Sequence, residues 1–166
     1  MLGIKVHMLA VLAVYIPFHL FEEALGNFPQ WMFEHGYTRR YKISYAFWMA
    51  GNIFFYYPCL LISVTIYLLF GEHFLFFGVG VVFWGVLNFL EHLFFTLKDR
   101  RISPGMFTSV LFFLIGVLAI SKLSQLEILS PRTVLLSTLV AAACAFLPIL
   151  MQIHIGRRIW PRFEKT

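Results

Sequence analysis

Five long apolar runs constrain this chain more than any other feature of its sequence. Each run is long enough to cross a bilayer as a helix, which takes about 20 residues. Because the runs take up most of the chain, little is left for a separate soluble domain. The sequence therefore predicts an all-α, polytopic membrane protein in which residues 1–166 form a single bundle of five transmembrane helices. The predicted spans are residues 6–25, 44–70, 74–97, 106–123 and 133–154.

The composition supports a membrane protein. Hydrophobic residues make up 60% of the chain and charged residues 13%, whereas a soluble domain has about 45–50% and about 25%. A signal peptide is the competing interpretation of the first run, because its apolar core would be about 7–15 residues long. Residues 8–18 fit that length, but His19, Glu22 and Glu23 follow directly, without a clear small-residue cleavage site. We therefore expect the first run to remain as a helix.

The positive charges indicate the orientation of the bundle. Ten of the thirteen Lys and Arg residues fall in the connections after the first and third runs and in the C-terminal tail. With five spans, these three regions lie on one side of the membrane. Cytoplasmic segments are enriched in Lys and Arg, so the sequence predicts a cytoplasmic C-terminus and an external N-terminus in the inner membrane. The net charge of +5 follows from this distribution and does not indicate nucleic-acid binding.

Two polar clusters interrupt the apolar runs. Residues 19–23 (HLFEE) lie near the end of the first run, and residues 88–92 (NFLEH) lie near the end of the third. In each cluster the polar groups are three and four positions apart, which is one face of a helix. Charged groups inside membrane helices are costly and usually mark function. In the predicted topology both clusters lie in the cytoplasmic half of the membrane.

Other runs bring polar residues to a similar depth. Asn52 lies in the early turns of the second run, and Gln152 and His154 lie at the end of the fifth. Gln152 shares a helical face with small residues and is the better inward candidate, whereas His154 falls on the other side. The fourth run has no polar stripe, so we expect it at the periphery of the bundle.

Prolines occur in three of the runs, at Pro17, Pro58 and Pro148. A proline removes one backbone hydrogen bond and frees a carbonyl about one turn earlier. The sequence therefore predicts a helix kink at each position. Pro17 also lies two residues before His19.

The carboxylates of the two clusters have no basic partner in the predicted spans. Glu22, Glu23 and Glu91 lie in the cytoplasmic half, and no Lys or Arg lies there with them. Three carboxylates cannot all stay ionised in a low-dielectric bundle. They can take up protons, a neighbouring histidine can become cationic, or a metal cation can bind. Imidazole and carboxylate groups are suitable ligands for zinc, iron or manganese.

The spacing of His and Glu favours a divalent metal among these alternatives. Di-iron and di-manganese bundles use Glu and His three positions apart on facing helices, and His19 and Glu22 have that spacing in reverse order. The adjacent Glu91 and His92 are a looser match, which favours one metal or a ligand-poor pair. The predicted metal ligands are His19, Glu22, Glu91 and His92. The residues predicted to act as base or to orient ligand or substrate are Glu23, Asn52 and Asn88.

The HLFEE segment resembles the signature of the HXXEE family, small bacterial membrane proteins named for that motif. Residues 88–92 fit the same resemblance, which would cover nearly the whole chain. The resemblance implies a membrane enzyme. Because no reaction is established for the family, it adds little chemistry to the residues themselves.

Three kinds of function are compatible with these features. The first is a metal-dependent membrane enzyme acting on a lipid-like or other apolar substrate, by hydrolysis or by oxidation. The second is a metal-free acid/base isomerase or cyclase of an isoprenoid-like substrate. The third is a proton- or cation-coupled carrier, which at this size is expected to form a homo-oligomer. We favour the first, with membrane lipid and an apolar small molecule as partners.

Overall fold

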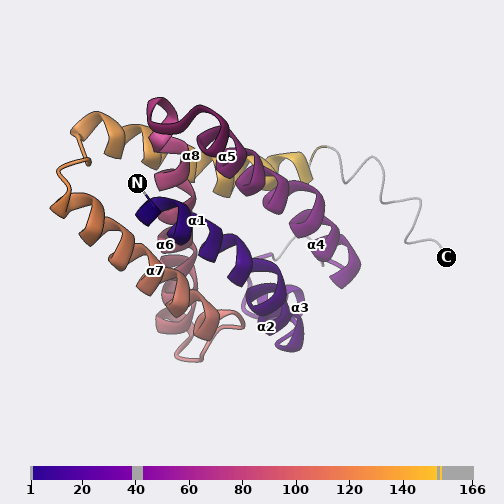
Figure 1. Ribbon diagram of the computed structural model, residues 1–166. Coiled ribbons are helices and arrows are strands. Elements are labelled where there is room, and N and C mark those ends of the chain that lie inside the picture. Colours follow the sequence, from indigo (N-terminus) through magenta and orange to yellow (C-terminus); the bar gives the residue numbers. More distant parts are fainter. Residues whose placement is uncertain (1, 39–42, 153, 155–166) are drawn as a thin grey trace.

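The computed structural model describes residues 2–38, 43–152 and 154, and the regular structure within these ranges is helical (Figure 1). The chain begins with α1 (Leu2–Val14), the π-helical η1 (Tyr15–Leu20), α2 (Phe21–Leu25) and α3 (Phe28–Glu34). Next come α4 (Tyr45–Gly51), the π-helical η2 (Asn52–Tyr56), α5 (Tyr57–Phe70) and the 3₁₀ turn η3 (Gly71–Phe74). The last helices are α6 (Leu75–Asp99), α7 (Met106–Gln125) and α8 (Pro131–Met151).

Four continuous helical stretches of the described chain are long and apolar enough to cross a membrane. The second stretch turns back at Gly71, whose φ of +66° is left-handed, and α5 and α6 therefore pack against each other. Helices lie at each of the five predicted spans, whereas five crossings and their direction remain predictions. The four stretches are Gly3–Leu25, Tyr45–Asp99, Met106–Gln125 and Pro131–Met151.

The bundle is built around α6, which packs against α1, α5, α7 and α8 (Figure 1). Glycines on α6 let its neighbours approach closely. A Cβ atom on Gly80 would lie 2.6 Å from the Val140 side chain of α8. One on Gly78 would lie 3.0 Å from the Tyr67 ring of α5. This close packing fixes the position of α6 relative to its neighbours, and with it the position of the second polar cluster near the end of α6.

The fourth run, expected at the periphery of the bundle, forms α7, which has several exposed apolar side chains but also turns polar side chains inward. α7 packs against both α1 and α6, and its Ser109 and Phe112 side chains are fully buried. The hydroxyl residues that it turns inward, Thr108 and Ser109, are confined to its first turn. They therefore form no stripe along the helix that a sequence pattern would reveal.

Two of the predicted proline kinks take the form of π-helical turns. η1 contains Pro17, and η2 ends two residues before Pro58. A π turn has i→i+5 hydrogen bonds and uses more residues than an α turn, which accommodates the proline ring. His19 lies within η1, and Glu23, four positions later, is the glutamate that faces it, whereas Glu22 bonds to the start of α7.

The connection that follows α3 is held against the end of α6. The Tyr37 hydroxyl donates to Asp99 Oδ2 at 2.8 Å, and the Lys98 Nζ lies 4.3 Å from the centre of the Tyr37 ring. Desolvation and the bond to Asp99 raise the pKa of Tyr37 to about 12, so the hydroxyl keeps its proton at neutral pH. α2 and α3 lie at this same end of the bundle (Figure 1).

Candidate metal centre

Three side chains from the two predicted clusters meet inside the bundle. His19 Nε2 lies 3.7 Å from Glu23 Oε1, and His92 Nε2 lies 3.5 Å from the same oxygen. His19 and His92 are each 1% exposed and Glu23 is 5% exposed. One ligand atom from each residue lies within 4.8 Å of the other two. The fold therefore brings a histidine of η1, a glutamate of α2 and a histidine of α6 into one group of metal-ligating side chains.

The His19 ring is oriented by a hydrogen-bond chain that ends at Glu22. The Thr108 Oγ1 lies 2.9 Å from His19 Nδ1 and donates to Glu22 Oε2 at 2.6 Å. A hydroxyl has one hydrogen to donate, so Nδ1 must be the donor in its bond to Thr108. The Gly105 carbonyl, 3.2 Å from the hydroxyl, is also an acceptor and leads to the same assignment. In the neutral ring the lone pair is then on Nε2, which faces Glu23.

The His92 ring is oriented in the same way by the connection between α6 and α7. The Ser103 hydroxyl donates to the His92 carbonyl at 3.1 Å and therefore accepts from His92 Nδ1, also at 3.1 Å. Thr96 holds Ser103 in place, because its hydroxyl donates to Ser103 Oγ and accepts from the Ser103 N–H. The lone pair of His92 is thus also on Nε2, facing Glu23.

Three atoms that carry lone pairs therefore face one another in a buried space. Two neutral imidazole nitrogens and a carboxylate oxygen repel one another unless a proton or a cation lies among them. Histidines that bind metals are commonly fixed by a hydrogen bond from the second ring nitrogen to an oxygen, as His19 and His92 are here. Asn88 Nδ2 lies 3.3 Å from His19 Nε2 and offers an N–H to that lone pair. The donor set fits a divalent cation.

Gly105 leaves open the space between the three residues. A Cβ atom there would lie 2.7 Å from His92 Cε1, 2.9 Å from Glu23 Cγ and 3.0 Å from His19 Cε1. Its φ of +90° is also one that a residue with a side chain rarely adopts. The site therefore needs a glycine here both for the backbone turn into α7 and for room.

Glu22, a predicted metal ligand, lies outside the group of three. Its carboxylate accepts from the backbone N–H of Phe107 at 3.0 Å and from that of Thr108 at 2.7 Å. These are free amides of the first turn of α7, where a negative charge is favourable. Glu22 thus caps α7 and supports His19 through Thr108, whereas Glu23, predicted as a base or supporting residue, lies with the histidines.

The remaining predicted residues have different surroundings. Glu91, a predicted ligand, lines a neighbouring cavity and is not part of the group of three. Asn52 is buried, and both ends of its side chain are bonded. The Tyr15 hydroxyl donates to Asn52 Oδ1 at 2.5 Å, and Asn52 Nδ2 donates to the Trp48 carbonyl at 3.0 Å. Asn52 therefore joins η1 to η2.

A cavity of about 240 Å³ adjoins the three residues. Gln152, predicted to point inward, lines it and donates from Nε2 to the Phe47 carbonyl at 2.7 Å, whereas His154 is exposed. Apolar and aromatic side chains make up most of the cavity wall, which is typical of sites for small organic ligands. The aromatic part of the wall includes Phe28, Trp48, Tyr56 and Trp84.

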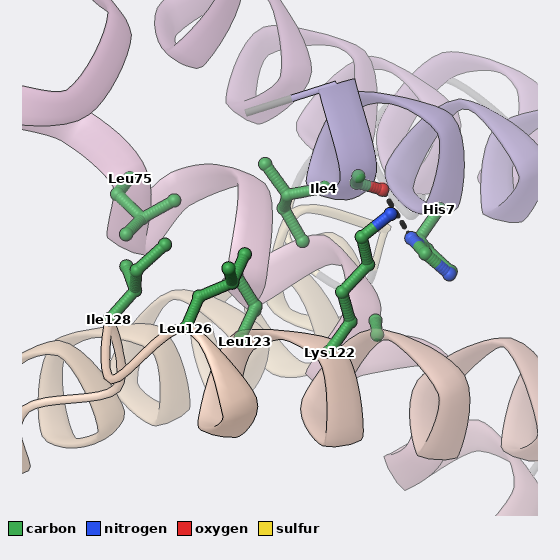
Figure 2. Close-up of a pocket in the computed structure, with 9 residues that line it drawn as sticks. Ile4, His7, Leu75, Lys122, Leu123, Leu126 and Ile128 are labelled. Atoms are coloured by element: carbon green, nitrogen blue, oxygen red, sulfur yellow. Dashed lines mark hydrogen bonds between the residues drawn. The ribbon is translucent and has the colours of Figure 1, made fainter.

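A second hollow, at the other end of α1 and α7, is too small for an organic ligand. Figure 2 shows it between the first turns of α1, where His7 is bonded to the Gly3 carbonyl, and the end of α7, where Lys122 extends alongside. Its volume is about 20 Å³, which is room for about one water molecule. The larger cavity is therefore the candidate site.

Comparison with known families gives one result. The family described as "Protein of unknown function with HXXEE motif" matches residues 10–120, about two thirds of the chain. The chain belongs to the HXXEE family. The matched part contains the three converging residues together with Glu22, Gly105 and Thr108. No curated protein and no solved structure matches the chain.

The residues that orient the HXXEE histidine and His92 were not predicted from the sequence. They are Ser103, Gly105 and Thr108, in the connection between α6 and α7 and in the first turn of α7. Serine, glycine and threonine are common at the start of any helix. Their one distinguishing feature in the sequence is that they cluster at the start of the fourth apolar run.

Proposed function

We propose that this protein is a metal-dependent membrane enzyme in which His19, Glu23 and His92 bind one divalent cation. The observation that carries this proposal is the convergence of three lone pairs at a buried point beside a cavity with an aromatic wall. The cavity would receive a lipid-like or other apolar substrate. The ligand set differs from the one expected from the sequence, because Glu23 takes the place of Glu22 and Glu91 lies apart.

The separation of the ligand atoms is compatible with a four-coordinate metal. With metal–ligand bonds of about 2.1 Å, tetrahedral angles place neighbouring ligand atoms about 3.4 Å apart, and right angles about 3.0 Å. The distances of 3.7 Å and 3.5 Å from Glu23 Oε1 to the two histidine nitrogens agree better with tetrahedral angles. Zinc favours this geometry. Two histidines and one carboxylate are also the ligands of oxygen-activating iron, so metal analysis must separate zinc from iron.

Three protein ligands leave a coordination position open, as in catalytic zinc sites. Ser103, Gly105 and Thr108 lie on one side of the three ligands, so the open position would face the cavity. A metal bound there would activate a water molecule or polarise a substrate oxygen. Metal binding at His19 Nε2 would require the Asn88 amide to turn away from it, and Asn88 would then orient the group at the open position.

The proposal also includes the position of the metal site in the membrane. Five crossings, with a cytoplasmic C-terminus in the inner membrane, would place the metal in the cytoplasmic half of the bilayer. A substrate dissolved in the membrane could then reach the cavity without leaving the apolar phase.

Elemental analysis of the purified protein tests the metal site. We expect one zinc or iron ion per chain in the wild type, and loss of that ion in both His19→Ala and His92→Ala. His73→Ala is the matched control, because His73 is an exposed histidine of η3 at a distance from the cavity. It should keep the full metal content.

Helical content, measured by circular dichroism, must be unchanged in each variant for the comparison to hold. A wild-type protein that is folded and takes up no zinc, iron or manganese would contradict the proposal. That outcome would favour the metal-free acid/base enzyme.

A further inference from the structure

Besides Glu23, a second carboxylate, Glu91 of α6, faces the cavity. Glu91 lines the cavity and is exposed, and among residues 2–38, 43–152 and 154 no side chain or backbone group forms a hydrogen bond or ion pair with it. It lies eight positions before Asp99, the last residue of α6, which corresponds to about 12 Å along the helix. A carboxylate at that depth in a membrane helix is costly unless a cation or a polar partner joins it.

The wall around Glu91 is suited to a positive charge. Trp48, Tyr56 and Trp84 line the same cavity, and Glu91 lies within electrostatic range of the Tyr56 hydroxyl. The faces of aromatic rings attract ammonium groups, tryptophan most strongly. Among the lining residues that the structure describes there is no Lys or Arg.

Two oxygen acceptors, one on Glu91 and one on Asn88, belong to side chains that line the cavity. Asn88 lies one helical turn before Glu91, on the same side of α6, and also lines the cavity. Its Oδ1 atom is buried and has no hydrogen-bond partner within the described part of the chain. A carboxylate and an unpartnered amide oxygen that belong to residues lining the same cavity suit a group with several N–H donors. A protonated primary amine has three donors and carries the matching charge.

The cavity also has a route to the bilayer. Of its lining residues, Glu91 on α6 and Ile149 on α8 are exposed, and these two helices pack against each other. The cavity therefore reaches the surface beside them. An apolar chain attached to the amine could extend past Ile149 into the membrane.

We infer that the cavity binds the protonated primary amine of a lipid-like amphiphile, with Glu91 as its ion-pair partner and the aromatic rings around it. The amine is carried either by an aminophospholipid headgroup or by a single apolar chain. If this amphiphile is also the substrate of the metal site, that part of the inference rests on the proposed function. Amine binding itself does not require the metal.

Binding of tritiated dodecylamine to protein in phosphatidylcholine nanodiscs tests this inference. Dodecylamine should displace the label at a concentration about tenfold or more below that of dodecanol or dodecanoic acid, because a hydrogen-bonded charge pair is lost with the other two. Glu91→Gln should remove this preference. Glu72→Gln is the matched control, since Glu72 is an exposed glutamate of η3 outside the cavity, and it should keep the preference.

Further measurements in the same assay identify the source of the amine and separate amine binding from the proposed metal-dependent function. Displacement by phosphatidylethanolamine assigns the amine to a phospholipid headgroup, and failure of that lipid while dodecylamine displaces assigns it to a single-chain amine. Chelator-treated wild-type protein should still prefer dodecylamine, and Glu91→Gln should keep its metal. Equal binding of amine and alcohol by the wild type would overturn the inference, as would joint loss of metal and amine in Glu91→Gln. A wild-type protein without metal that still selects the amine through Glu91 would overturn only the proposed function.

Discussion

Glu22 and Glu23 are neighbours in the sequence, but their carboxylates have different partners. Glu22 accepts from the first amides of α7, and Glu23 lies between two histidine nitrogens. Glu23, four positions after His19, lies on the face of the histidine, whereas Glu22 reaches the start of α7. A motif with two consecutive glutamates can therefore serve structure with one residue and chemistry with the other.

Exchanging each glutamate for glutamine should separate these two roles. Glu23→Gln should lose the metal and be as stable to heat as the metal-free wild type, because a buried negative charge is removed. Glu22→Gln should bind metal at saturating zinc but lose about 1–2 kcal/mol of stability, because the cap on α7 loses its charge. Metal content and thermal unfolding in detergent provide the two measurements. Loss of metal in Glu22→Gln alone would contradict this assignment.

Gly105 is expected to be as important for metal binding as the ligands themselves. Gly105→Ala would place a methyl group against all three ligand residues and should abolish metal binding. Gly71→Ala is the matched control, since Gly71 also has a positive φ but a Cβ atom there would have no neighbouring atom within 4 Å. Both variants should lose roughly 1–2 kcal/mol from backbone strain. If Gly105→Ala keeps a stoichiometric metal, the ligand group is looser than these contacts imply.

At the level of elements, the connection between α6 and α7 supports the site by orienting its histidines. It contributes Ser103 to His92, and the first turn of α7 contributes Thr108 to His19. Both histidines are therefore oriented by a segment that carries no metal ligand. The first helical stretch and α6 provide the three proposed ligands, and the connection together with the first turn of α7 orients their rings.

Removing one of these hydroxyls should lower the affinity for the metal without unfolding the bundle. Ser103→Ala leaves His92 Nδ1 without its oxygen partner, and we expect metal affinity to fall about 10- to 100-fold. Ser109→Ala is the control, because the buried Ser109 hydroxyl donates to the Met106 carbonyl within α7. Chelator competition measures both affinities. Equal affinities for the two variants would argue against a role for Ser103 in orienting His92.

At the scale of the whole molecule, the turn at Gly71 decides the number of membrane crossings. If the helices on either side of it each cross once, the protein has five spans and its two ends lie on opposite sides. The positive charges then place the metal group near the cytoplasmic surface. If the two helices instead entered and left the membrane on the same side, η3 would lie inside the membrane.

Labelling of single cysteines in intact cells tests this topology. In a chain with Cys59 and Cys144 replaced by alanine, Glu72→Cys and Ser130→Cys should react with a membrane-impermeant maleimide. Arg100→Cys should react only after the cells are opened. All three positions are exposed, so reactivity reports the side of the membrane. An unreactive Glu72→Cys, with Ser130→Cys labelled, would contradict five crossings.

The helical class, the helix positions and the two polar clusters were predictable because they depend on local properties. Hydrophobicity over about 20 residues indicates a membrane helix, and i, i+3 and i+4 spacing indicates a shared face. The choice between Glu22 and Glu23 was not predictable, because both spacings reach the same face of a regular helix. The position of α7 was not predictable either, since its inward polar groups occupy a single turn.

The sequence by itself determined that this chain is helical, with stretches long and apolar enough to cross a membrane, and that His19, His92 and the glutamates fall in two polar clusters near the ends of such stretches. Only the tertiary structure decided that Glu23 joins the histidines, that Glu22 caps α7, and that Ser103, Gly105 and Thr108 shape the site. The physical reason is the separation in sequence between the residues that interact. Apolar periodicity is a property of neighbouring residues, whereas the bond from the Thr108 amide to Glu22 joins residues 86 positions apart, which only the packing of α7 against the first helices brings together.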